Sequence, residues 1–485
     1  MYEAIRNPHI ILTDKLKLTL NEQILQKRAV ESNFYKRAGR SISPQRFFDI
    51  VLHSVSGKGY CSLNSSSIEF IERNKKRVTK QGISNRYSPE AVEFIRLILR
   101  DVLSLQVSQI IDAGFLNDFE GLIIKDATRF DLPEQLQSLF KGFGGSCTSE
   151  SAISIQYEYD LKNLAFKSIE LTSANVPDIS KASISPGQFN KNDLIIRDQG
   201  YFLQESFNEL IKSEAFFVSR LNTTAKIYQD EYTNDFISFK ELYHQMLRNK
   251  IVSKDINIRL GKKDRIPVRM VVQLVSDEIY RKRISTLEAN AKKKKWVASE
   301  EARYRCRFHV IITNIPPEKM SIAQLFKIYP LRWQIELMFK LWKSGLGIHE
   351  VQKMNHNRFL CMLYAKLIYI TLTMETISLA RRWQFKKTHK ILSVIKSFNT
   401  LIDKMRILQA VRTIWNKRNE KFIKNMFNLL SENNWLEKRN DRLNFEEIFD
   451  LFYCNSDKYD YICGETVGKI INPIAYKQLT SKNAH

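Results

Sequence analysis

The pattern of apolar residues in the first part of the chain has the period of helices. Over residues 88–104, apolar side chains recur at the three- and four-residue spacing of an amphipathic helix. Ser88 and Pro89 place a capping hydroxyl before a proline at the first helical position, and a second Ser-Pro pair stands at residues 43–44. We therefore expect residues 1–115 to be helical.

Two short apolar runs farther along the chain are typical of strands that are buried on both faces of a sheet. The runs, residues 122–124 and 194–196, are each followed by one basic residue and then by an aspartate, Asp126 or Asp198. Functional groups of open α/β sheets gather where such strands end, so both aspartates are candidate site residues. The alternative is that each aspartate serves only to form a turn.

The segments around these runs mix strand and helix patterns. Residues 201–213 have the spacing of a helix, and segments rich in β-formers predict strands at 151–160, 164–173, 215–221 and 304–315. Such a mixture predicts an α/β domain over residues 116–370. Within this domain we expect residues 222–303 to form a β-rich insertion. Residues 371–485 are expected to form a helical C-terminal region.

Residues 329–344 predict an amphipathic helix with a narrow polar face. Pro330 can begin this helix, and nothing breaks it before Gly345. At about 100° per residue, four polar side chains fall within a stripe about 60° wide. These are Tyr329, Arg332, Glu336 and Lys343. The opposite face is apolar, so the helix is expected to pack by that face and to present the stripe outward. An ordinary solvated helix face is the alternative explanation.

The charge of the chain indicates the class of its partner. The 485 residues carry a formal net charge of +24, with a pI near 9.6, which indicates a polyanion. The most apolar stretch, residues 359–374, is too short to span a bilayer comfortably and includes Lys366, so we expect a buried helix and no membrane partner. Nucleic acid is then the expected partner. The basic stretch at residues 71–82 suits a DNA-binding domain over residues 1–115, although a solvated charged surface would look the same.

The sequence lacks the motifs of several other kinds of protein. Its six cysteines form no CxxC pair, which argues against a zinc site and fits reduced thiols in a cytosol. It has no glycine-rich phosphate loop, so no nucleotide cofactor is expected. The first residues lack the layout of a secretory signal. The expected location is therefore cytoplasmic.

The candidate carboxylates suit phosphoryl transfer on DNA. This reaction depends on in-line geometry and on positive charge near the phosphate. Two Mg²⁺ ions about 4 Å apart supply both, and Mg²⁺ prefers hard oxygen ligands. Asp126, Asp198 and Glu336 are the candidate ligands. Arg332 and Lys343 are placed to hold DNA phosphates, and Tyr329 could hydrogen-bond or pack beside the same DNA strand.

At this point the residues resemble a known family. Tyr329-x2-Arg332-x3-Glu336-x6-Lys343 resembles the YREK signature of bacterial cut-and-paste DDE transposases of the insertion-sequence-four family. The segments KDATRF and RDQGYF resemble the regions around that family's two catalytic aspartates, which fall on Asp126 and Asp198. The resemblance implies a ribonuclease H-like mixed-sheet core with a β-rich insertion, flanked by helical N- and C-terminal regions.

The resemblance also implies an activity and its partners. Such enzymes use Mg²⁺, for which Mn²⁺ may substitute, as two ions in each active site. They cut double-stranded DNA at transposon ends, form a hairpin, and transfer the strand into target DNA as a homodimer. Relatives stabilise a flipped base with a tryptophan of the insertion, for which Trp296 is the candidate. The resemblance implies a bacterial, nucleoid-associated protein, and the region 371–485 is the candidate for dimerisation.

Two other functions remain open from the sequence. The chain could be a ribonuclease H-like nuclease that cuts DNA without joining it. It could also be a catalytically silent DNA-binding relic that keeps the fold. Cleavage of DNA ends in the presence of Mg²⁺ would exclude the relic, and a joined product would exclude the plain nuclease.

Overall fold

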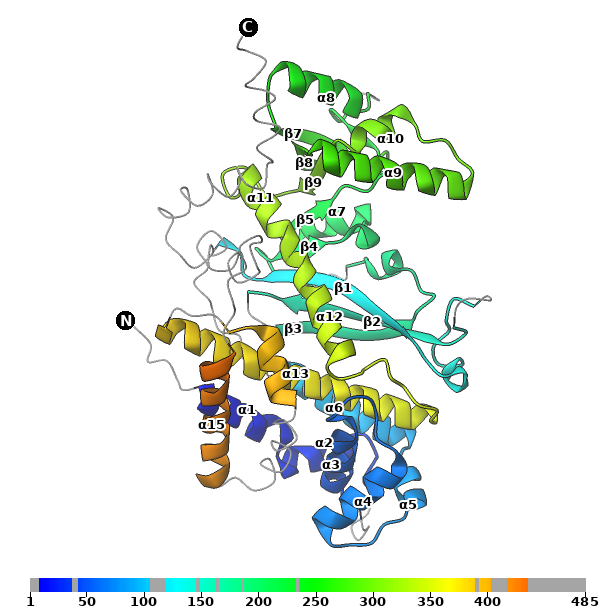
Figure 1. Ribbon diagram of the computed structural model, residues 1–485, viewed down its shortest axis with the longest axis vertical. Helices are drawn as coiled ribbons and strands as arrows, with labels where there is room; N and C mark the ends of the chain where they lie inside the picture. Colours follow the sequence, from blue (N-terminus) through cyan, green and yellow to red (C-terminus); the bar gives the residue numbers. More distant parts are fainter. Residues whose placement is uncertain are drawn as a thin grey trace. The chain divides into compact units, whose positions relative to one another are not determined.

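The computed structural model describes residues 8–36, 42–104, 118–144, 149–162, 165–184, 187–232, 235–388, 392–402 and 417–434 (Figure 1). The chain forms two compact units. Unit 1 comprises Met1–Gln109, Asp126–Val176 and Gln334–Arg442. Unit 2 comprises Ile110–Lys125, Pro177–Trp333 and Leu443–His485.

The N-terminal part of unit 1 is helical, as its apolar spacing predicts. Its helices are α1 (Pro8–Leu20), α2 (Glu22–Glu31), α3 (Pro44–Val55), α4 (Leu63–Asn74), α5 (Lys80–Ser84) and α6 (Pro89–Ser104). Both Ser-Pro signals begin a helix, because the hydroxyls of Ser43 and Ser88 accept hydrogen bonds from backbone N–H groups three residues later. The ring of Phe34 stacks on Phe94 and contacts Phe47, which joins α3 to α6.

The apolar stretch at residues 359–374 lies within a much longer helix, α13 (His356–Thr388), which packs against α3 and α6 in unit 1. With 33 residues, α13 is long enough to cross a membrane, so the expectation that the stretch is too short was wrong. However, 89% of its most apolar window is buried inside the protein, as in a core helix. Burial, rather than length, supports the predicted buried helix. A further helix, α15 (Lys417–Asn433), packs against α1 and α13.

The strands form one mixed sheet. They are β1 (Leu122–Asp131), β2 (Ala152–Asp160), β3 (Ala165–Ser173), β4 (Leu194–Arg197), β5 (Phe216–Arg220), β6 (Ile227–Tyr228), β7 (Ser253–Leu260), β8 (Ile266–Leu274) and β9 (Phe308–Thr313). Their hydrogen-bonded order is β3-β2-β1-β4-β5-β9-β8-β7-β6. β1, β4 and β5 run parallel to one another, whereas β2 and β3 are antiparallel to each other. The order β3-β2-β1-β4-β5 with these directions is that of the ribonuclease H-like fold, so the predicted fold class is confirmed.

The predicted insertion, residues 222–303, contains more helix than its pattern suggests. Besides β6, β7 and β8 it holds α8 (Phe239–Arg248), α9 (Asp277–Lys294) and α10 (Glu300–Arg305). Sequence patterns missed α9 because this helix is polar on nearly all sides, with Ala291 as its one buried residue. β8 pairs with β9 and β9 with β5, so the strands of this segment extend the same sheet. The domain boundaries stay predictions.

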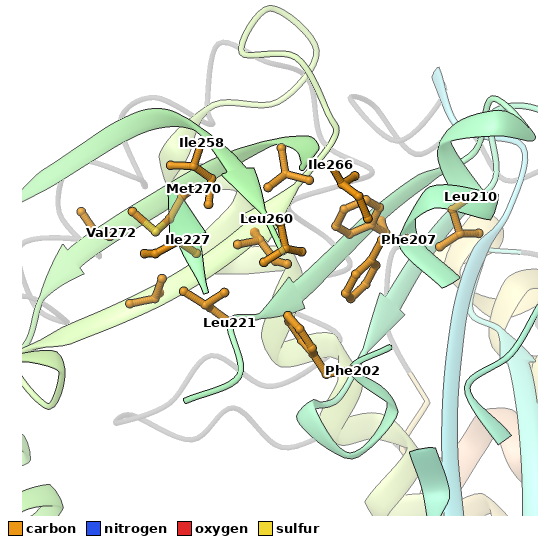
Figure 2. Close-up of a cluster of buried hydrophobic side chains, with 14 of the residues drawn as sticks. Phe202, Phe207, Leu210, Leu221, Ile227, Ile258, Leu260, Ile266, Met270 and Val272 are labelled. Atoms are coloured by element: carbon orange, nitrogen blue, oxygen red, sulfur yellow. The ribbon is translucent and has the colours of Figure 1, made fainter. Parts of the chain in front are cut away.

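A cluster of buried apolar side chains forms the core of unit 2 (Figure 2). It joins the β4–β5 region to the strands β7 and β8 and to the helix α7 (Gln204–Lys212), which the sequence predicts at residues 201–213. Phe207 stacks on Phe217 with ring centroids 4.5 Å apart. Removing these rings from water stabilises the folded state by about 25 cal/mol for each Å² of apolar surface buried. The core thus fixes β4 and β5, which carry candidate site residues at their ends.

The other described helical segments are short or belong to the candidate site. They are η2 (Glu134–Leu136), η3 (Asp178–Lys181), η4 (Gln199–Tyr201), α11 (Ile322–Ile328), η5 (Tyr329–Trp333) and α12 (Gln334–Ser344).

Candidate active site

The two predicted aspartates follow directly on paired residues of neighbouring strands. In the parallel pairing of β1 with β4, Lys125 is the partner of Arg197. Asp126 is the next residue of one strand and Asp198 the residue that follows the other. Paired strands lie about 4.8 Å apart. The register therefore places the dipeptides Lys125-Asp126 and Arg197-Asp198 at equivalent positions of adjacent strands. The two dipeptides are far apart in the chain, so the sequence alone does not reveal this.

Asp126 lies within its strand rather than at the strand's end. β1 continues to Asp131, so the expectation that Asp126 ends a strand was wrong. β1 extends because the residues after Asp126 include the β-formers Thr128 and Phe130. The half-buried carboxylate of Asp126 accepts a hydrogen bond from the backbone N–H of Ala127 at 2.8 Å.

The charge of Asp126 also acts on Tyr157 of β2. Burial, with smaller contributions from Tyr159 and Asp126, holds the pKa of the Tyr157 hydroxyl well above its usual value.

Asp198 combines turn formation with a charged neighbour. It caps η4 and accepts a hydrogen bond from the backbone N–H of Gly200 at 3.5 Å, so the turn role left open from the sequence is real. Its Oδ1 atom also lies 3.5 Å from Nε of Arg332. The carboxylate side chain is 39% exposed, whereas that of Arg332 is 15% exposed. The carboxylate thus keeps access to solvent while the arginine that faces it is largely buried.

Arg220 is a further candidate site residue, one that the sequence patterns do not reveal. In the parallel pairing of β4 with β5, Arg197 is the partner of Ser219, so Arg220 ends β5 beside the position of Asp198. Its guanidinium carbon lies 5.2 Å from the centre of the Tyr329 ring, a cation–π distance. The signal that could have found it is the basic residue next to the end of the predicted strand 215–221, once parallel pairing of this strand with residues 194–196 is assumed.

The charges of Asp198, Arg220 and Arg332 all affect the pKa of the Tyr329 hydroxyl. Burial raises the pKa of its hydroxyl, and nearby Asp198 adds to that rise. The positive charges of Arg220 and Arg332 oppose it. Within unit 2 the structure therefore brings together Asp198, Arg220, Tyr329 and Arg332, of which the sequence predicted three.

The basic residues that precede the aspartates do not face the site. Lys125 and Arg197 are buried, and their charged groups lie 5.9 and 6.0 Å from the ring of Tyr201. Successive side chains of a strand point to opposite faces, so these cations lie on the face opposite to that of the residues that follow them. Lys125 and Arg197 therefore pack on the opposite face of the sheet, against Tyr201.

The signature residues lie on two successive helical segments rather than on one helix. Tyr329 and Arg332 belong to the 3₁₀ segment η5 of unit 2, and Glu336 and Lys343 to α12 of unit 1. The helix predicted to begin at Pro330 is therefore wrong in its start, since α11 already precedes η5. Pro330 has no N–H to donate, which breaks the α-helical hydrogen bonding and favours a tighter turn.

α12 has the apolar face that its sequence predicts. Ile335, Met338, Leu341 and Trp342 are buried, whereas Glu336 is exposed in the first turn of the helix. The Trp342 ring packs against Tyr157 of β2 with centroids 5.2 Å apart, which holds α12 on the sheet strands of unit 1. The positive end of the helix dipole lies at this first turn and favours the negative charge of Glu336.

Lys343 holds α12 to the strand that carries Asp126. Its Nζ atom donates to the backbone carbonyl of Arg129 at 2.9 Å. Burial lowers the pKa of this half-buried ammonium, which indicates that its charge is costly without a partner. An ammonium has three hydrogens, so one such bond leaves donors for a further ligand. A contact of Lys343 with DNA stays a prediction.

Trp296 follows the C-cap of α9 in unit 2, directly after four consecutive lysines at 292–295. Its ring is 42% exposed, and its backbone N–H donates to the carbonyl of Ala291. Exposure beside basic residues is compatible with a contact to DNA. Base stabilisation by Trp296 stays a prediction.

The described residues contain no group of three or more His, Cys, Asp or Glu side chains close enough to hold a metal ion. Asp126 and Glu336 belong to unit 1 and Asp198 to unit 2. Two observations still fit a divalent cation: the donors are hard carboxylate oxygens, and two of them follow paired residues of adjacent strands. The convergence of all three carboxylates stays a prediction.

Comparison with known families assigns the chain to one of them. The family described as "Transposase DDE domain" matches residues 117–372, more than half of the chain, and the chain belongs to this family. It is therefore an enzyme that acts on DNA, and members of the family depend on divalent metal. The resemblance to transposases of bacterial insertion sequences is thereby confirmed.

Individual transposases are similar over nearly the whole chain. The transposase of insertion sequence IS231C from Bacillus thuringiensis subsp. berliner is 26% identical over 468 residues, which cover 92% of this chain and 96% of the relative. The transposase of IS1151 from Clostridium perfringens is 26% identical and covers 81% of this chain and 85% of its own. Among solved structures, a piggyBac transposase synaptic complex with hairpin DNA aligns over 94% of this chain and 92% of its own, with a TM-score of 0.41 at 10% identity.

Proposed function

We propose that this protein cuts the ends of its transposable element and joins them to target DNA with Asp126, Asp198 and Glu336 as metal ligands. Support for this comes from the family and from one observation above all: Asp126 and Asp198 follow paired residues in adjacent parallel strands. Neither turn formation nor strand capping requires two aspartates in the same register. Glu336 is exposed at the start of α12, in the position that the signature assigns to the third carboxylate.

Two Mg²⁺ ions, with Mn²⁺ as a substitute, would activate the attacking oxygen and stabilise the leaving one when bound. The basic residues of the chain have a different task. Arg332 and Arg220, whose charges both act on Tyr329, offer planar donors that suit the oxygens of one DNA phosphate. Before DNA binds, Arg332 is held by Asp198. A DNA phosphate that binds Arg332 would break its ion pair with Asp198. The carboxylate oxygens of Asp198 would then be available for other ligands.

Further steps of the proposed function follow the family alone. The liberated 3′-hydroxyl would attack the opposite strand to give a hairpin, with Trp296 against a displaced base. The protein would work as a homodimer on paired transposon ends, with residues 371–485, most of which lie outside the described residues, as the candidate dimer surface. Neither step requires a nucleotide cofactor.

A cleavage assay with labelled DNA tests the proposal. The substrate is a duplex that carries the inverted repeats flanking the coding region, incubated with full-length protein and Mg²⁺ together with a target plasmid. Nicked, hairpin and joined products are expected. Cleavage without any joined product would instead establish a plain nuclease, and binding without cleavage would establish a silent DNA-binding protein.

The variant Asp126→Ala links the activity to the site. It is expected to abolish cutting while end binding remains, because a single carboxylate contributes little to DNA affinity. Asp131→Ala is the matched control, since Asp131 is an exposed aspartate at the far end of the same strand. Retained cutting by Asp126→Ala would remove Asp126 from the active site.

A further inference from the structure

A loop of the N-terminal helices and the turn after α12 are joined by hydrogen bonds within unit 1. The backbone N–H of Gly59 donates to the Leu346 carbonyl at 2.9 Å. The hydroxyl of Tyr60 donates to the Ile348 carbonyl at 3.0 Å. We call this contact the loop–turn junction, made by residues 56–61 between α3 and α4 and by residues 345–350 after α12.

A buried lysine of α13 holds both halves of the junction. The Nζ atom of Lys366 donates to the Gly59 carbonyl at 2.5 Å and to the Leu346 carbonyl at 2.7 Å. It also lies 4.3 Å from the centre of the Tyr60 ring. Lys366 is fully buried, although lysine is among the residues that are least often buried. Its two bonds go to two different segments, so one side chain fixes their separation.

The junction is too tight for a side chain at Gly347. A Cβ atom on Gly347 would lie 2.7 Å from the backbone nitrogen of Gly59, closer than real Cβ atoms come to other atoms. The φ angles of Gly347 and Gly59 are +58° and +73°, in the left-handed region that favours glycine. The two segments therefore pack backbone against backbone, and a small shift of either one displaces the other.

The turn of the junction, residues 345–350, directly follows the C-terminal end of α12, the helix that carries Glu336. Within it, the N–H groups of Gly347 and Ile348 donate to the carbonyls of Lys343 and Trp342. The turn is therefore continuous with the last turn of α12, where Lys343 contacts β1. A displacement of the loop–turn junction would therefore shift the C-terminal end of α12.

Packing alone does not account for a lysine at this position. A methionine or leucine would fill a similar volume without the cost of burying an amine. The amine instead donates to the Gly59 carbonyl and adds a second hydrogen bond to the Leu346 carbonyl, which already accepts from the Gly59 N–H. Its position between the N-terminal helices, which are the predicted DNA-binding segment, and the α12 turn gives it a role beyond stability.

From these contacts we infer that Lys366 is a positioning residue for strand cleavage, which fixes the end of α12 against the loop between α3 and α4. The inference rests on the proposed function, because it gives α12 a part in catalysis. Lys366 touches no DNA in this account. It keeps the helix of Glu336 and Lys343 in place relative to the N-terminal helices that hold the transposon end.

The surroundings of Lys366 make this contact sensitive to pH. Burial lowers the pKa of its amine to about 7, while Glu350 of the turn and Cys61 of the loop act in the opposite direction. Tyr60 also faces the amine, and burial raises the pKa of its hydroxyl, so it stays neutral. Hydrogen bonds from a charged amine are stronger than those from a neutral one. The junction is therefore held more tightly below neutral pH than above it.

The test compares Lys366→Met with Lys387→Met in the full-length protein. Lys387 lies on the same helix but is exposed, which makes the second variant a matched control. The probe is the duplex with the flanking inverted repeats, in Mg²⁺. We expect Lys366→Met to bind this duplex as the wild type does and to cut it about 10- to 100-fold more slowly, as a misplacement of about 1 Å can cause. The ratio of wild-type to Lys366→Met rates should fall between about pH 6.5 and about pH 8.5, because the wild-type amine loses its proton in that range.

Each outcome decides the matter. Cutting by Lys366→Met at the rate of Lys387→Met, or a rate defect that does not change with pH, would overturn the inference. If Lys366→Met does not fold, Tyr60→Phe replaces it, because this change removes the bond to Ile348 and keeps the ring. Slower cutting with normal end binding by Tyr60→Phe then supports the inference, and an unaltered rate refutes it. Failure of the wild type itself to cut would instead refute the proposed function.

Discussion

The Nε atom of Arg332 lies 3.5 Å from the Oδ1 atom of Asp198. These residues are distant in the chain, but the contact of η5 with β4 in unit 2 brings them together. One is the arginine of the polar stripe, and the other is the aspartate of the second apolar run. Their contact joins two sequence signals that are independent of each other, which favours a shared function over two accidental patterns.

Loss of this arginine is expected to slow DNA cutting. Arg332→Ala removes the neighbour of Asp198 and one proposed phosphate donor, so the single-turnover cleavage rate should fall by about 10² or more, as for other preorganised electrostatic groups. Lys212→Ala is the control, because Lys212 forms an exposed ion pair with Glu209 on α7, outside the predicted DNA-binding segment, and such pairs contribute little. Equal cleavage rates for the two variants would show that Arg332 has no part in the reaction.

Lys343 is expected to contribute to the salt dependence of DNA binding. Lys343→Ala should weaken end binding and reduce the slope of log K against log salt by about 0.9, the contribution of one phosphate contact. Lys340→Ala changes an exposed lysine of the same helix and should leave the slope unaltered. Binding titrations at several salt concentrations measure both. An unchanged slope for Lys343→Ala would restrict this residue to its bond with the Arg129 carbonyl.

The core of unit 2 is expected to be sensitive to loss of Phe207 (Figure 2). Phe207 is fully buried and stacks on Phe217, so Phe207→Ala should lower the free energy of unfolding by about 3–5 kcal/mol. Phe143→Ala removes a ring that is 62% exposed and should cost less than about 0.5 kcal/mol. Urea denaturation of both variants provides the comparison, and similar losses would contradict the packing described for Phe207.

The free energy of unfolding is expected to rise with pH above neutrality even though the hydrogen bonds of the junction weaken, because deprotonation of Lys366 removes the larger cost of burying its charge. The amine has a pKa of about 7 in the folded protein, below the value of about 10.4 that an unfolded chain gives it. Between these values the unfolded chain binds more protons, so the free energy of unfolding increases with pH, by at most about 1.4 kcal/mol per pH unit. Below pH 7 both states carry the proton, and this contribution no longer changes.

The contribution of Lys366 can be isolated by subtraction. Denaturation of the wild type and of Lys366→Met between about pH 7 and pH 9 should show a rise that only the wild type has. Lys387→Met should keep the rise, since Lys387 is exposed. An identical pH dependence in Lys366→Met would mean that the amine keeps an ordinary pKa in the folded protein.

The sequence predicted those features that depend on local pattern. The helices α3 and α6 begin at their Ser-Pro signals, and the strands β2 and β3 lie where alternation and β-formers placed them. The buried face of α12 follows from the spacing of its apolar residues. These features were predictable because each of them is determined by residues within a few positions of one another.

Features that depend on pairing between distant segments were beyond such patterns. The register that sets Arg220 beside the position of Asp198 depends on which strands become neighbours, and no local signal contains that. The α9 helix is polar on nearly all sides, so no apolar spacing predicts it. The local pattern around Pro330 predicts a helix start, whereas its place between α11 and α12 makes it part of a 3₁₀ segment. The junction of Lys366 joins segments that are far apart in sequence.

The central claim, that the carboxylates bind the metal ions of DNA cleavage, is tested most directly by a change of metal preference. Asp198→Cys replaces a hard oxygen with a soft thiolate, which binds Mg²⁺ poorly and Mn²⁺ or Cd²⁺ better. We predict that this variant fails to cut transposon-end DNA in Mg²⁺ and regains cutting in Mn²⁺ or Cd²⁺. Asp131→Cys should cut in Mg²⁺ throughout. Full activity of folded Asp198→Cys in Mg²⁺, or no recovery with either softer ion, would contradict the account.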